Sequence, residues 1–397
     1  MTEDEFYMER ALALAAKGTG RVNPNPLVGA VVVKDGSIIG EGYHMSCGGL
    51  HAERNALAGC TEPAKGAVMY VTLEPCCHYG KTPPCTEALI KHSISKVVIG
   101  MRDPNPLVAG KGIRILKDAG ISVVEGVLEE KCRDLNRIFI HYITTKTPYI
   151  TMKYAMTMDG RTATRTGASK WITGVPARVR VHEDRSRHMA IMAGKGTVLA
   201  DDPMLNCRIP GGRQPIRVIC DTGLTIPVSS RVVVTARELP TWILTCEKDA
   251  DRWKPYEEMG CRIISVSKGK YGVDLQEAVR LLGEKGIDSI YLEGGSELHA
   301  SALEAGLVQE IHTYIAPKLF GGKDARTPIA GQGVELPSQA YRMEVIQIEQ
   351  IGEDILIQSR VLPREKSAAD SREEIREESN ADSRTETQED GICSQGL

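Results

Sequence analysis

Three short fragments of the chain constrain its fold because their side chains suit a single metal ion. His51-Ala52-Glu53 offers an imidazole and a carboxylate, and Cys76 and Cys85 follow it as two thiols. A catalytic zinc ion takes three protein ligands and keeps its fourth position for a water molecule, whose pKa falls to roughly 7. We therefore expect His51, Cys76 and Cys85 to bind zinc, so the fold must bring these fragments together.

Glu53 has a different expected role. Zinc deaminases use a glutamate that is not a ligand to move protons from the water to the ring and then to the departing amine. The pattern thus predicts hydrolytic deamination with Glu53 as the catalytic acid and base.

The local pattern agrees with this assignment. A strand at residues 68–73 would deliver Cys76 just past its end, and helices would open at His51 and at Cys85, which leads into residues 86–92. Helix N-termini stabilise thiolates.

The eight residues between Cys76 and Cys85 leave an alternative open, because deaminases usually have two there. Cys77 and His78 compete as ligands, and a structural zinc site could use Cys76, Cys77, His78 and Cys85.

The same long insert carries a family resemblance. The run from Glu74 to Cys85, with Asn23-Pro24-Asn25-Pro26-Leu27-Val28-Gly29 before it and Met101-Arg102-Asp103-Pro104-Asn105-Pro106 after it, closely resembles the bifunctional riboflavin-biosynthesis deaminase/reductase family. The resemblance extends from about residue 5 to about residue 362. It implies that the pyrimidine and phosphate pocket is lined by Asn25, His78, Lys81, Asp103 and Asn105. For Asn25 and Asn105 the alternative is that an Asn-Pro pair simply starts a turn.

Composition narrows the class of protein. A chain of 397 residues predicts two domains, each large enough to bury its own core. A net charge of −3 gives no electrostatic footprint for nucleic acid or an anionic membrane. The acidic first residues indicate no targeting segment. No apolar run reaches the roughly 18 residues of a membrane span. The cysteines are scattered along the chain, which indicates reduced thiols. We expect a cytoplasmic homo-oligomer that binds a small molecule, with neither nucleic acid nor membrane as partner.

The order of elements predicts two α/β domains. In residues 1–147 helices are expected at 5–17 and 112–119, besides the two at the zinc site, and strands at 27–33, 38–42, 68–73, 96–100 and 121–124. This order is typical of a cytidine-deaminase-like α/β/α sandwich. A polar linker is expected at 141–148, where Pro148 cannot continue a helix.

Residues 148–363 would form the second α/β domain, which the resemblance implies is similar to dihydrofolate reductase. Strands are expected at 149–155, 188–193, 216–220, 241–246, 289–293 and 310–315, and helices at 176–187, 274–285 and 297–305. Residues 364–397 hold five Lys or Arg against ten Asp or Glu and few aliphatic side chains, which predicts a disordered acidic tail.

The second domain has a candidate cofactor site where Gly294 and Gly295 join a strand to a helix. Backbone N–H groups at such a helix start can bind a phosphate, although the glycines could serve only a tight turn. The pattern is not the G-x-G-x-x-G of a Rossmann domain.

The resemblance covers residues 153–161, 169–173, 197–203 and 293–295 of this domain. It implies an NADPH site made of Ala155, Trp171, Thr197, Asp201, Thr222, Gly295, Ser296, Glu297, Leu298, His299, Ala300 and Ser301. It implies a substrate site made of Ser169, Arg185, Leu205, Arg208 and Glu293, with Lys153 as a candidate for contacting the sugar where the hydride arrives. The forked donors of Arg185 and Arg208 suit a phosphate, while the alternative is that each is a solvated surface charge.

The expected chemistry is therefore deamination of 2,5-diamino-6-(5-phosphoribosylamino)pyrimidin-4-one, followed by NADPH-dependent reduction of its ribosyl side chain to ribityl. Two alternatives remain at this point. The first domain could act on nucleosides or RNA bases beside a binding module, or the zinc could be structural in a scaffold protein.

Overall fold

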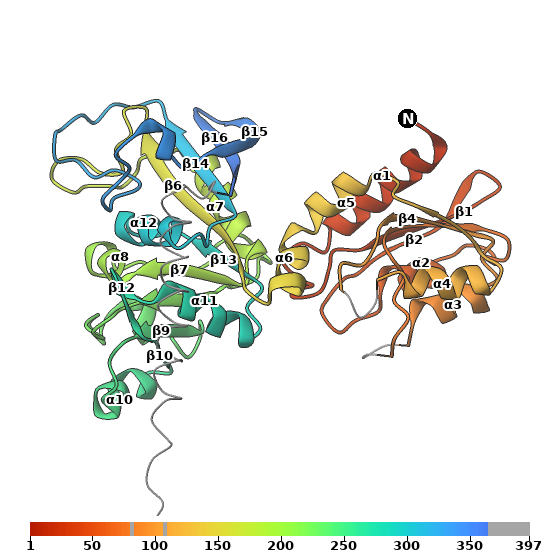
Figure 1. Cartoon of the computed structure of the whole chain (residues 1–397), viewed down its shortest axis with the longest axis horizontal. Coiled ribbons are helices and arrows are strands. Elements are labelled where there is room, and N and C mark those ends of the chain that lie inside the picture. The colour runs from red at the N-terminus through yellow and green to blue at the C-terminus, as the bar shows by residue number, and fades with distance from the viewer. Residues whose placement is uncertain (80–82, 106–108, 364–397) are drawn as a thin grey trace, which may run out of the picture.

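The computed structural model describes residues 1–79, 83–105 and 109–363, which form two lobes. Helix α6 (Arg137–Thr145) lies where the lobes meet (Figure 1). None of the helices in these ranges combines the length and apolarity that a bilayer crossing needs. Lys81 and the predicted acidic tail at 364–397 lie outside the described residues.

The first lobe is a five-stranded sheet between two layers of helices, as the sequence predicted. The sheet order is β2-β1-β3-β4-β5; β1 runs antiparallel to β2 and β3, and β3, β4 and β5 are parallel. One face carries α1 and α5 and the other carries α2, α3 and α4 (Figure 1). The strands are β1 (Gly29–Lys34), β2 (Ser37–Tyr43), β3 (Val68–Leu73), β4 (Lys96–Met101) and β5 (Ser122–Glu125). The helices are α1 (Glu3–Ala16), α2 (Ala52–Ala58), α3 (Cys85–Lys91), α4 (Lys111–Asp118) and α5 (Glu129–Leu135).

Glycines in β2 let α2 approach the sheet closely. A Cβ atom at Gly42 would lie 2.3 Å from the Ala56 nitrogen, and one at Gly40 would lie 2.4 Å from the Ala56 oxygen. No side chain fits at these distances, so the helix rests directly on the strand. This contact fixes the start of α2, where His51 stands.

The second lobe is built on a nine-stranded sheet in the order β10-β9-β8-β7-β13-β6-β14-β16-β15. The strands from β10 to β14 in that order are parallel, and β16 and β15 add an antiparallel edge. The strands are β6 (Tyr149–Thr157), β7 (Ala190–Gly194), β8 (Ile216–Cys220), β9 (Thr241–Thr245), β10 (Arg262–Ser265), β13 (Ser289–Leu292), β14 (Glu310–Ala316), β15 (Met343–Ile351) and β16 (Asp354–Val361). A small hairpin pairs β11 (Lys268–Gly269) with β12 (Gly272–Val273).

The helices of this lobe mostly follow parallel strands. They are α7 (Val175–Arg187), α8 (Lys195–Asp201), α9 (Arg231–Val234), α10 (Ala250–Glu258), α11 (Leu275–Glu284) and α12 (Ser296–Glu304), with a short 3₁₀ turn, η1 (Pro337–Gln339). The expected helices at 176–187, 274–285 and 297–305 are therefore present within one residue. The sequence analysis missed α5, α8, α9, α10, β10 and the β15–β16 hairpin.

The segment expected as a polar linker, 141–148, is helical as far as Thr145, where α6 ends. The polar residues that suggested a loop are satisfied inside the helix. The Thr144 hydroxyl donates to the Ile140 carbonyl at 2.7 Å, and the Thr145 hydroxyl donates to the His141 carbonyl at 2.8 Å. Threonine often bonds back to the preceding turn in this way.

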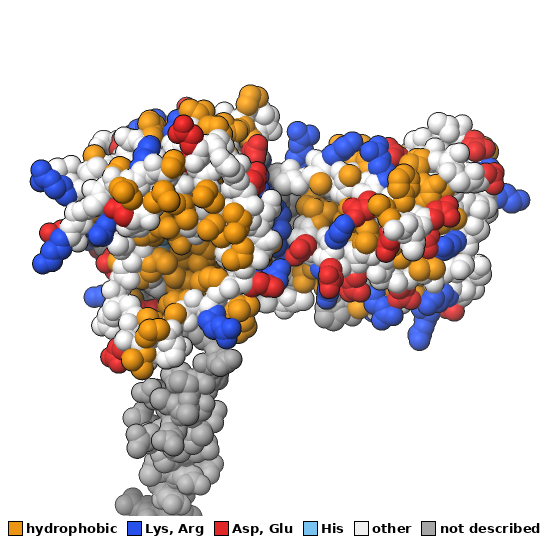
Figure 2. All heavy atoms as spheres, turned by 90° about the horizontal axis from the view of Figure 1, so that it is seen from above, with side chains coloured by type: hydrophobic (Ala, Val, Ile, Leu, Met, Phe, Trp, Pro, Cys, Tyr) orange, Lys and Arg blue, Asp and Glu red, His pale blue; other side chains and the backbone are white. Residues whose placement is uncertain are grey.

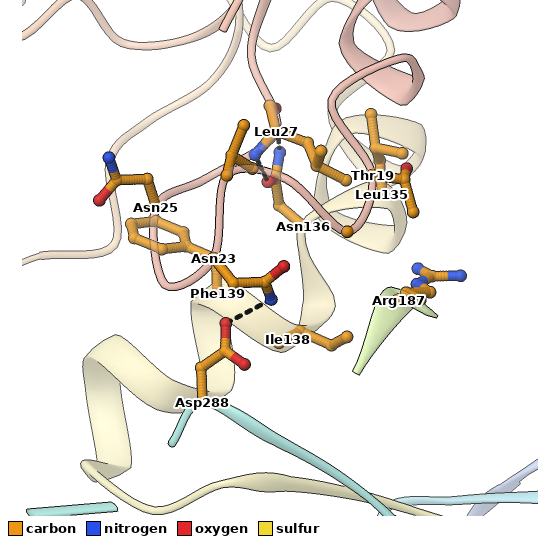
Figure 3. Close-up of a pocket in the computed structure, with 12 residues that line it drawn as sticks. Thr19, Asn23, Asn25, Leu27, Leu135, Asn136, Ile138, Phe139, Arg187 and Asp288 are labelled. Carbon is orange, nitrogen blue, oxygen red and sulfur yellow. Dashed lines mark hydrogen bonds between the residues drawn. The ribbon is translucent and has the colours of Figure 1, made fainter. Parts of the chain in front are cut away.

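Direct hydrogen bonds join the two lobes. The Tyr142 hydroxyl donates to the Gly283 carbonyl at 3.0 Å, and the Asn23 amide donates to the Asp288 carboxylate at 2.6 Å. Figure 3 shows the second bond in a crevice at the junction, where the Asn136 side chain also bonds the main chain of Leu27.

Candidate active sites

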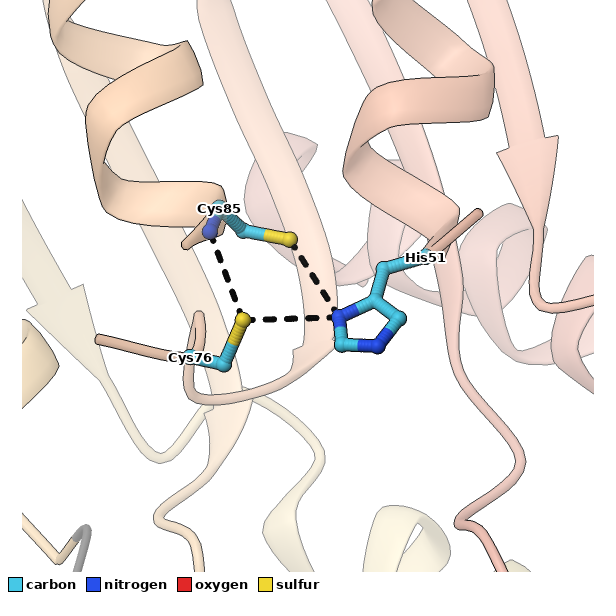
Figure 4. A group of neighbouring side chains, drawn as sticks. All are labelled: His51, Cys76 and Cys85. Atoms are coloured by element: carbon cyan, nitrogen blue, oxygen red, sulfur yellow. Dashed lines mark hydrogen bonds between the residues drawn. The ribbon is translucent and has the colours of Figure 1, made fainter. Parts of the chain in front are cut away.

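The first lobe brings the three predicted zinc ligands together (Figure 4). The sulfur atoms of Cys76 and Cys85 each lie 3.4 Å from Nδ1 of His51. Tetrahedral zinc, with Zn–S near 2.3 Å and Zn–N near 2.05 Å, would put sulfur and nitrogen about 3.6 Å apart. The three side chains therefore fit a zinc ion, with a fourth position left for water.

Each of these residues occupies the end of a secondary-structure element. His51 precedes the first residue of α2, Cys85 is the first residue of α3, and Cys76 follows β3. The Cys85 backbone N–H donates to the Cys76 sulfur at 3.3 Å. The Cys85 thiol and the His51 ring hold the pKa of Cys76 well below its usual range, so this thiol is set to ionise.

Glu53 lies beside the cluster but is not one of its three ligand groups. It is the second residue of α2 and is almost completely buried. Burial, followed by the negative charge of Cys76, raises the pKa of Glu53 to about 7. A carboxyl group in this position can take up and release a proton near neutral pH.

The alternative four-ligand site does not form among the described residues. Cys77 is only partly buried and His78 is exposed, and neither belongs to the cluster. The metal-binding cluster that the structure forms is His51 with Cys76 and Cys85.

Asn25 reaches the cluster through a histidine that the sequence analysis missed. The Asn25 amide lies 3.1 Å from Nε2 of His44, whose Nδ1 lies 3.0 Å from the Leu50 carbonyl. The His44 ring packs edge-on against the His51 ring at 5.5 Å. A lone histidine after a strand carries no motif, so only the fold reveals it.

Glu74 is a second residue that the sequence analysis left without a role. Its buried carboxylate accepts backbone N–H groups from Asp103 at 3.2 Å and from Gly110 and Gly112, both at 3.0 Å. The Asp103 side chain in turn accepts the Asn105 N–H at 2.9 Å, as the turn interpretation of this segment expects. Glu74 thus holds the segment that carries Asp103 and Asn105, and its place just before Pro75 and Cys76 was the available signal.

In the second lobe the predicted cofactor residues gather at the carboxyl ends of the parallel strands, where α/β sheets bind ligands. Gly294 and Gly295 separate β13 from α12, beside Thr197 of α8. A Cβ atom at Gly294 would lie 2.9 Å from the Thr197 hydroxyl and 3.0 Å from the Ala193 Cβ. The missing side chain leaves the start of α12 open.

The residues at this edge fit a phosphate-bearing cofactor such as NADPH. The backbone N–H groups at the start of α12 are oriented to bind an anion. In addition, Nε2 of buried His299 has no hydrogen-bond partner among the residues that the structure describes, although Nδ1 of the same ring lies 3.0 Å from the Pro328 carbonyl.

The other predicted cofactor residues lie around the same edge. Lys170 lies 3.8 Å from Asp201, which brings the exposed Trp171 loop next to α8. Arg178 packs over the Trp171 ring at 4.6 Å. Thr222 follows β8, Ala155 lies in β6, and 296–301 form the first turns of α12.

The predicted substrate residues Arg185, Glu293 and Lys153 form one partly buried group. Arg185 donates to both carboxylate oxygens of Glu293, at 2.5 and 2.8 Å, and to the Asn206 carbonyl at 2.9 Å. Burial lowers the pKa of Lys153, while Glu293 opposes that change. The guanidinium fork of Arg185 is therefore engaged by Glu293.

The remaining predicted substrate residues are less enclosed. Arg208 is exposed, and its Nε donates to Nε2 of His182 at 3.0 Å. Leu205 is buried with a left-handed backbone (φ 48°), and Ser169 is partly exposed in the loop before Trp171.

Comparisons with known proteins agree with both halves. The family described as "RibD C-terminal domain" matches residues 148–357, and the "Cytidine and deoxycytidylate deaminase zinc-binding region" matches residues 1–101. The riboflavin biosynthesis protein RibD of Actinobacillus pleuropneumoniae is 53% identical over 354 residues, covering 89% of this chain and 94% of that protein. The chain belongs to the RibD family.

Other RibD proteins support the same assignment. RibD of Escherichia coli K12 is 41% identical over 368 residues, covering 89% of this chain and 98% of its own. The structure of Acinetobacter baumannii RibD superposes with a TM-score of 0.81 at 36% identity, covering 91% and 99% of the two chains. A structure from Thermotoga maritima superposes with a TM-score of 0.80 at 40% identity, with the same coverage. Its title is a diaminohydroxyphosphoribosylaminopyrimidine deaminase/5-amino-6-(5-phosphoribosylamino)uracil reductase.

Membership of the RibD family confirms the predicted function and cofactors. The chain is a bifunctional enzyme of riboflavin biosynthesis, with a zinc-dependent deaminase and an NADPH-dependent reductase. The predicted fold, a cytidine-deaminase-like sandwich followed by a dihydrofolate-reductase-like α/β domain, is confirmed as well. The two alternatives, a deaminase of nucleosides or RNA bases beside a binding module and a scaffold protein with a structural zinc, are therefore excluded.

Proposed function

We propose that residues 1–147 deaminate 2,5-diamino-6-(5-phosphoribosylamino)pyrimidin-4-one at its 2-amino group, and that residues 148–363 reduce the ribosyl side chain of the product to ribityl. The observation that carries this proposal is the presence in one chain of two built sites. One is the His51, Cys76 and Cys85 cluster beside buried Glu53, and the other is the partly buried Lys153, Arg185 and Glu293 group. The printed title of the Thermotoga maritima relative names these two activities.

For the deamination, His51, Cys76 and Cys85 would hold zinc, which supplies an activated water when bound. Glu53 would take one proton from that water and pass it to the ring, and would then take the second proton from the attacking oxygen and pass it to the amino group, which leaves as ammonia. The pyrimidine and its phosphate would lie against Asn25, His78, Asp103, Asn105 and Lys81.

For the reduction, NADPH supplies the hydride. The start of α12 and Thr197 would hold its phosphates, with Ala155, Trp171, Asp201 and Thr222 around them. Lys153 and Glu293 would orient the sugar, and Ser169, Leu205 and Arg208 would complete the pocket. Since Glu293 already pairs with Arg185, that arginine would act on the substrate through Glu293, and Arg208 is the freer candidate for the phosphate.

The test is to incubate the purified full-length protein with the diaminopyrimidine substrate, with and without NADPH, and to weigh the products. Without NADPH we expect an amine replaced by oxygen, and with NADPH a further gain of two hydrogens. Consumption of NADPH before deamination, or a product that keeps both amines, would contradict the proposal.

We also propose that the enzyme is a homo-oligomer that pairs through β15. This strand is one of the two edges of its sheet, and its residues Val345 and Ile348 are 55% and 66% exposed. Figure 2 shows hydrophobic side chains gathered over this side of the lobe. Edge strands with exposed apolar residues pair readily, and a second copy offers the same strand for symmetric antiparallel pairing.

Light scattering on the full chain tests this interface. Ile348→Lys should dissociate the oligomer, whereas Val234→Lys, at an exposed position on α9, should leave the mass unchanged. Equal masses for wild type and Ile348→Lys would rule out β15 as the contact.

We further propose a cytoplasmic location, since the ten cysteines in the described ranges are free thiols. Cell fractionation would test this location.

A further inference from the structure

Buried polar side chains along β14 form a chain of charges inside the reductase lobe. Glu310, His312 and Tyr314 alternate along the strand, so all three point to the same face of the sheet. That face is the one against which α7 packs, because Tyr314 lies in one apolar cluster with Ala177 and Val181 of this helix.

His312 lies between two carboxylates. Its Nδ1 is 3.2 Å from Asp184 of α7, and its Nε2 is 2.8 Å from Glu310. Burial disfavours a charge on the ring, but Asp184 and Glu310 together raise the pKa of His312 to about 9. The ring is therefore an imidazolium at neutral pH, donating to a carboxylate from each nitrogen.

One end of this chain of charges is Arg137, which precedes the second lobe in the sequence. Arg137 is the first residue of α6, the helix at the junction (Figure 1). Its Nε and Nη2 donate to the two carboxylate oxygens of Glu310 at 2.7 and 3.2 Å. The Tyr149 hydroxyl donates to the same carboxylate at 2.9 Å.

The other end is Asp184, which adjoins the proposed substrate site. Asp184 accepts the hydroxyl of Tyr291 at 3.3 Å and that of Tyr314 at 3.5 Å, and the Lys153 ammonium lies 5.8 Å from the Tyr314 ring centre. In the register of β6 against β14, Lys153 is the direct neighbour of His312. The next residue on α7 after Asp184 is Arg185, which holds Glu293.

Charges of alternating sign thus lead from the junction to the reductase site: Arg137, Glu310, His312 and Asp184. Arg187 adds a further positive charge that interacts with both Asp184 and Glu310. Removing Arg137 would take two direct hydrogen bonds away from Glu310 and leave its carboxylate with His312 and Tyr149 as direct partners. A buried charge without its partner is strongly unfavourable, so the neighbours must shift or change protonation.

We propose that Arg137 is a positioning residue for the reduction, acting through Glu310, His312 and Asp184 on the side chains of Lys153 and Glu293. The inference rests on the assignment of these two residues to the reductase substrate site under "Proposed function". It makes α6, which lies on the deaminase side of the proposed domain boundary, a part that the reductase needs.

The test uses three variants of the full-length chain at neutral pH. Arg137→Gln should lower kcat/KM for reduction about tenfold, within the usual range for coupling between sites, while the KM for NADPH stays unchanged. Arg137→Lys should recover part of the loss because it keeps the charge but not the fork. Tyr142→Phe is the matched control, since it removes another bond between the lobes without touching the chain of charges.

Deamination by the same preparations reports whether the first lobe is folded, and it should be unchanged in all three. The unfolding transition of the reductase lobe, measured by calorimetry, reports whether the second lobe of each variant is folded. Reduction that survives Arg137→Gln, or that falls equally in Tyr142→Phe, would overturn the proposal. The second result would show that any loosening of the junction is enough.

A double variant tests the route. If Arg137 acts through His312, Arg137→Gln combined with His312→Gln should reduce no worse than His312→Gln alone. Losses that multiply would overturn the route. Failure of the proposed function is distinguishable, because the wild type would then not reduce the deaminated product, or Lys153→Met would reduce it as well as the wild type does.

Discussion

Replacing Arg185 with methionine removes the partner of a buried carboxylate and should destabilise the reductase lobe. The side chains of Arg185 and Glu293 are 13% and 8% exposed, and two hydrogen bonds join them. Breaking a buried ion pair by deleting one partner costs about 3–5 kcal/mol. Burial raises the pKa of Glu293, but the opposite effects of Arg185 and, after it, Lys153 are larger, so the pKa is lowered overall. In the variant, the charge of Lys153 would partly compensate for the loss of Arg185. We therefore expect the lower end of the range, about 3 kcal/mol.

This free energy converts to a measurable shift. In a domain of about 200 residues, 1 kcal/mol corresponds to roughly 2–4 °C, so the unfolding temperature of the reductase lobe should fall by about 6–12 °C. Scanning calorimetry on the full-length protein measures it, and the reductase transition is the one that NADPH raises. Deamination should persist.

Arg180→Met is the matched control on the same helix. Arg180 lies 3.6 Å from Glu349 and 3.9 Å from Glu183, and all three side chains are substantially exposed. Pairs of this kind contribute about 0–1 kcal/mol. If Arg185→Met shifts the reductase transition no more than Arg180→Met does, the argument from burial is refuted.

Four further outcomes follow from the structure. Glu53→Gln should keep zinc while deamination falls by about 10²–10⁴-fold; zinc lost together with activity in metal analysis would make Glu53 a ligand. Cys85→Ser should lower zinc content sharply and Cys77→Ser should not, and equal losses would favour the four-ligand alternative. Glu74→Gln turns one acceptor oxygen into a donor that faces N–H groups, so deamination should fall about tenfold or more with zinc retained; unchanged kinetics would contradict the positioning role. Because the pKa of His312 is raised by folding, its contribution to stability is complete below about 6.5, the ordinary value, and is lost as the pH rises through about 9. Melting curves of His312→Gln should therefore depend less on pH in that window than those of the wild type, and identical pH dependence would show that the ring is not charged.

The sequence alone determined the parts of this protein that depend on local chemistry. His51, Cys76 and Cys85 could be chosen because a zinc ion accepts few ligand types, and each of the three stands at a helix start or a strand end that its own neighbours specify. The glycine pair before α12 was visible for the same reason, because two glycines between a strand and a helix indicate a tight strand-to-helix turn.

Only the tertiary structure decided which charged side chains meet. Arg185 looks like a free phosphate-binding fork in the sequence, yet its partner Glu293 is 108 residues away. Arg137 and Glu310 are separated by 173 residues, and the second part of α6, from His141, was interpreted as a linker. Such pairs form because a parallel sheet brings distant strands side by side, and no periodicity within one segment records which buried charge it will face. The zinc ligands can thus be identified from short segments of the sequence, whereas the ion pairs around the reductase site form only when the chain folds.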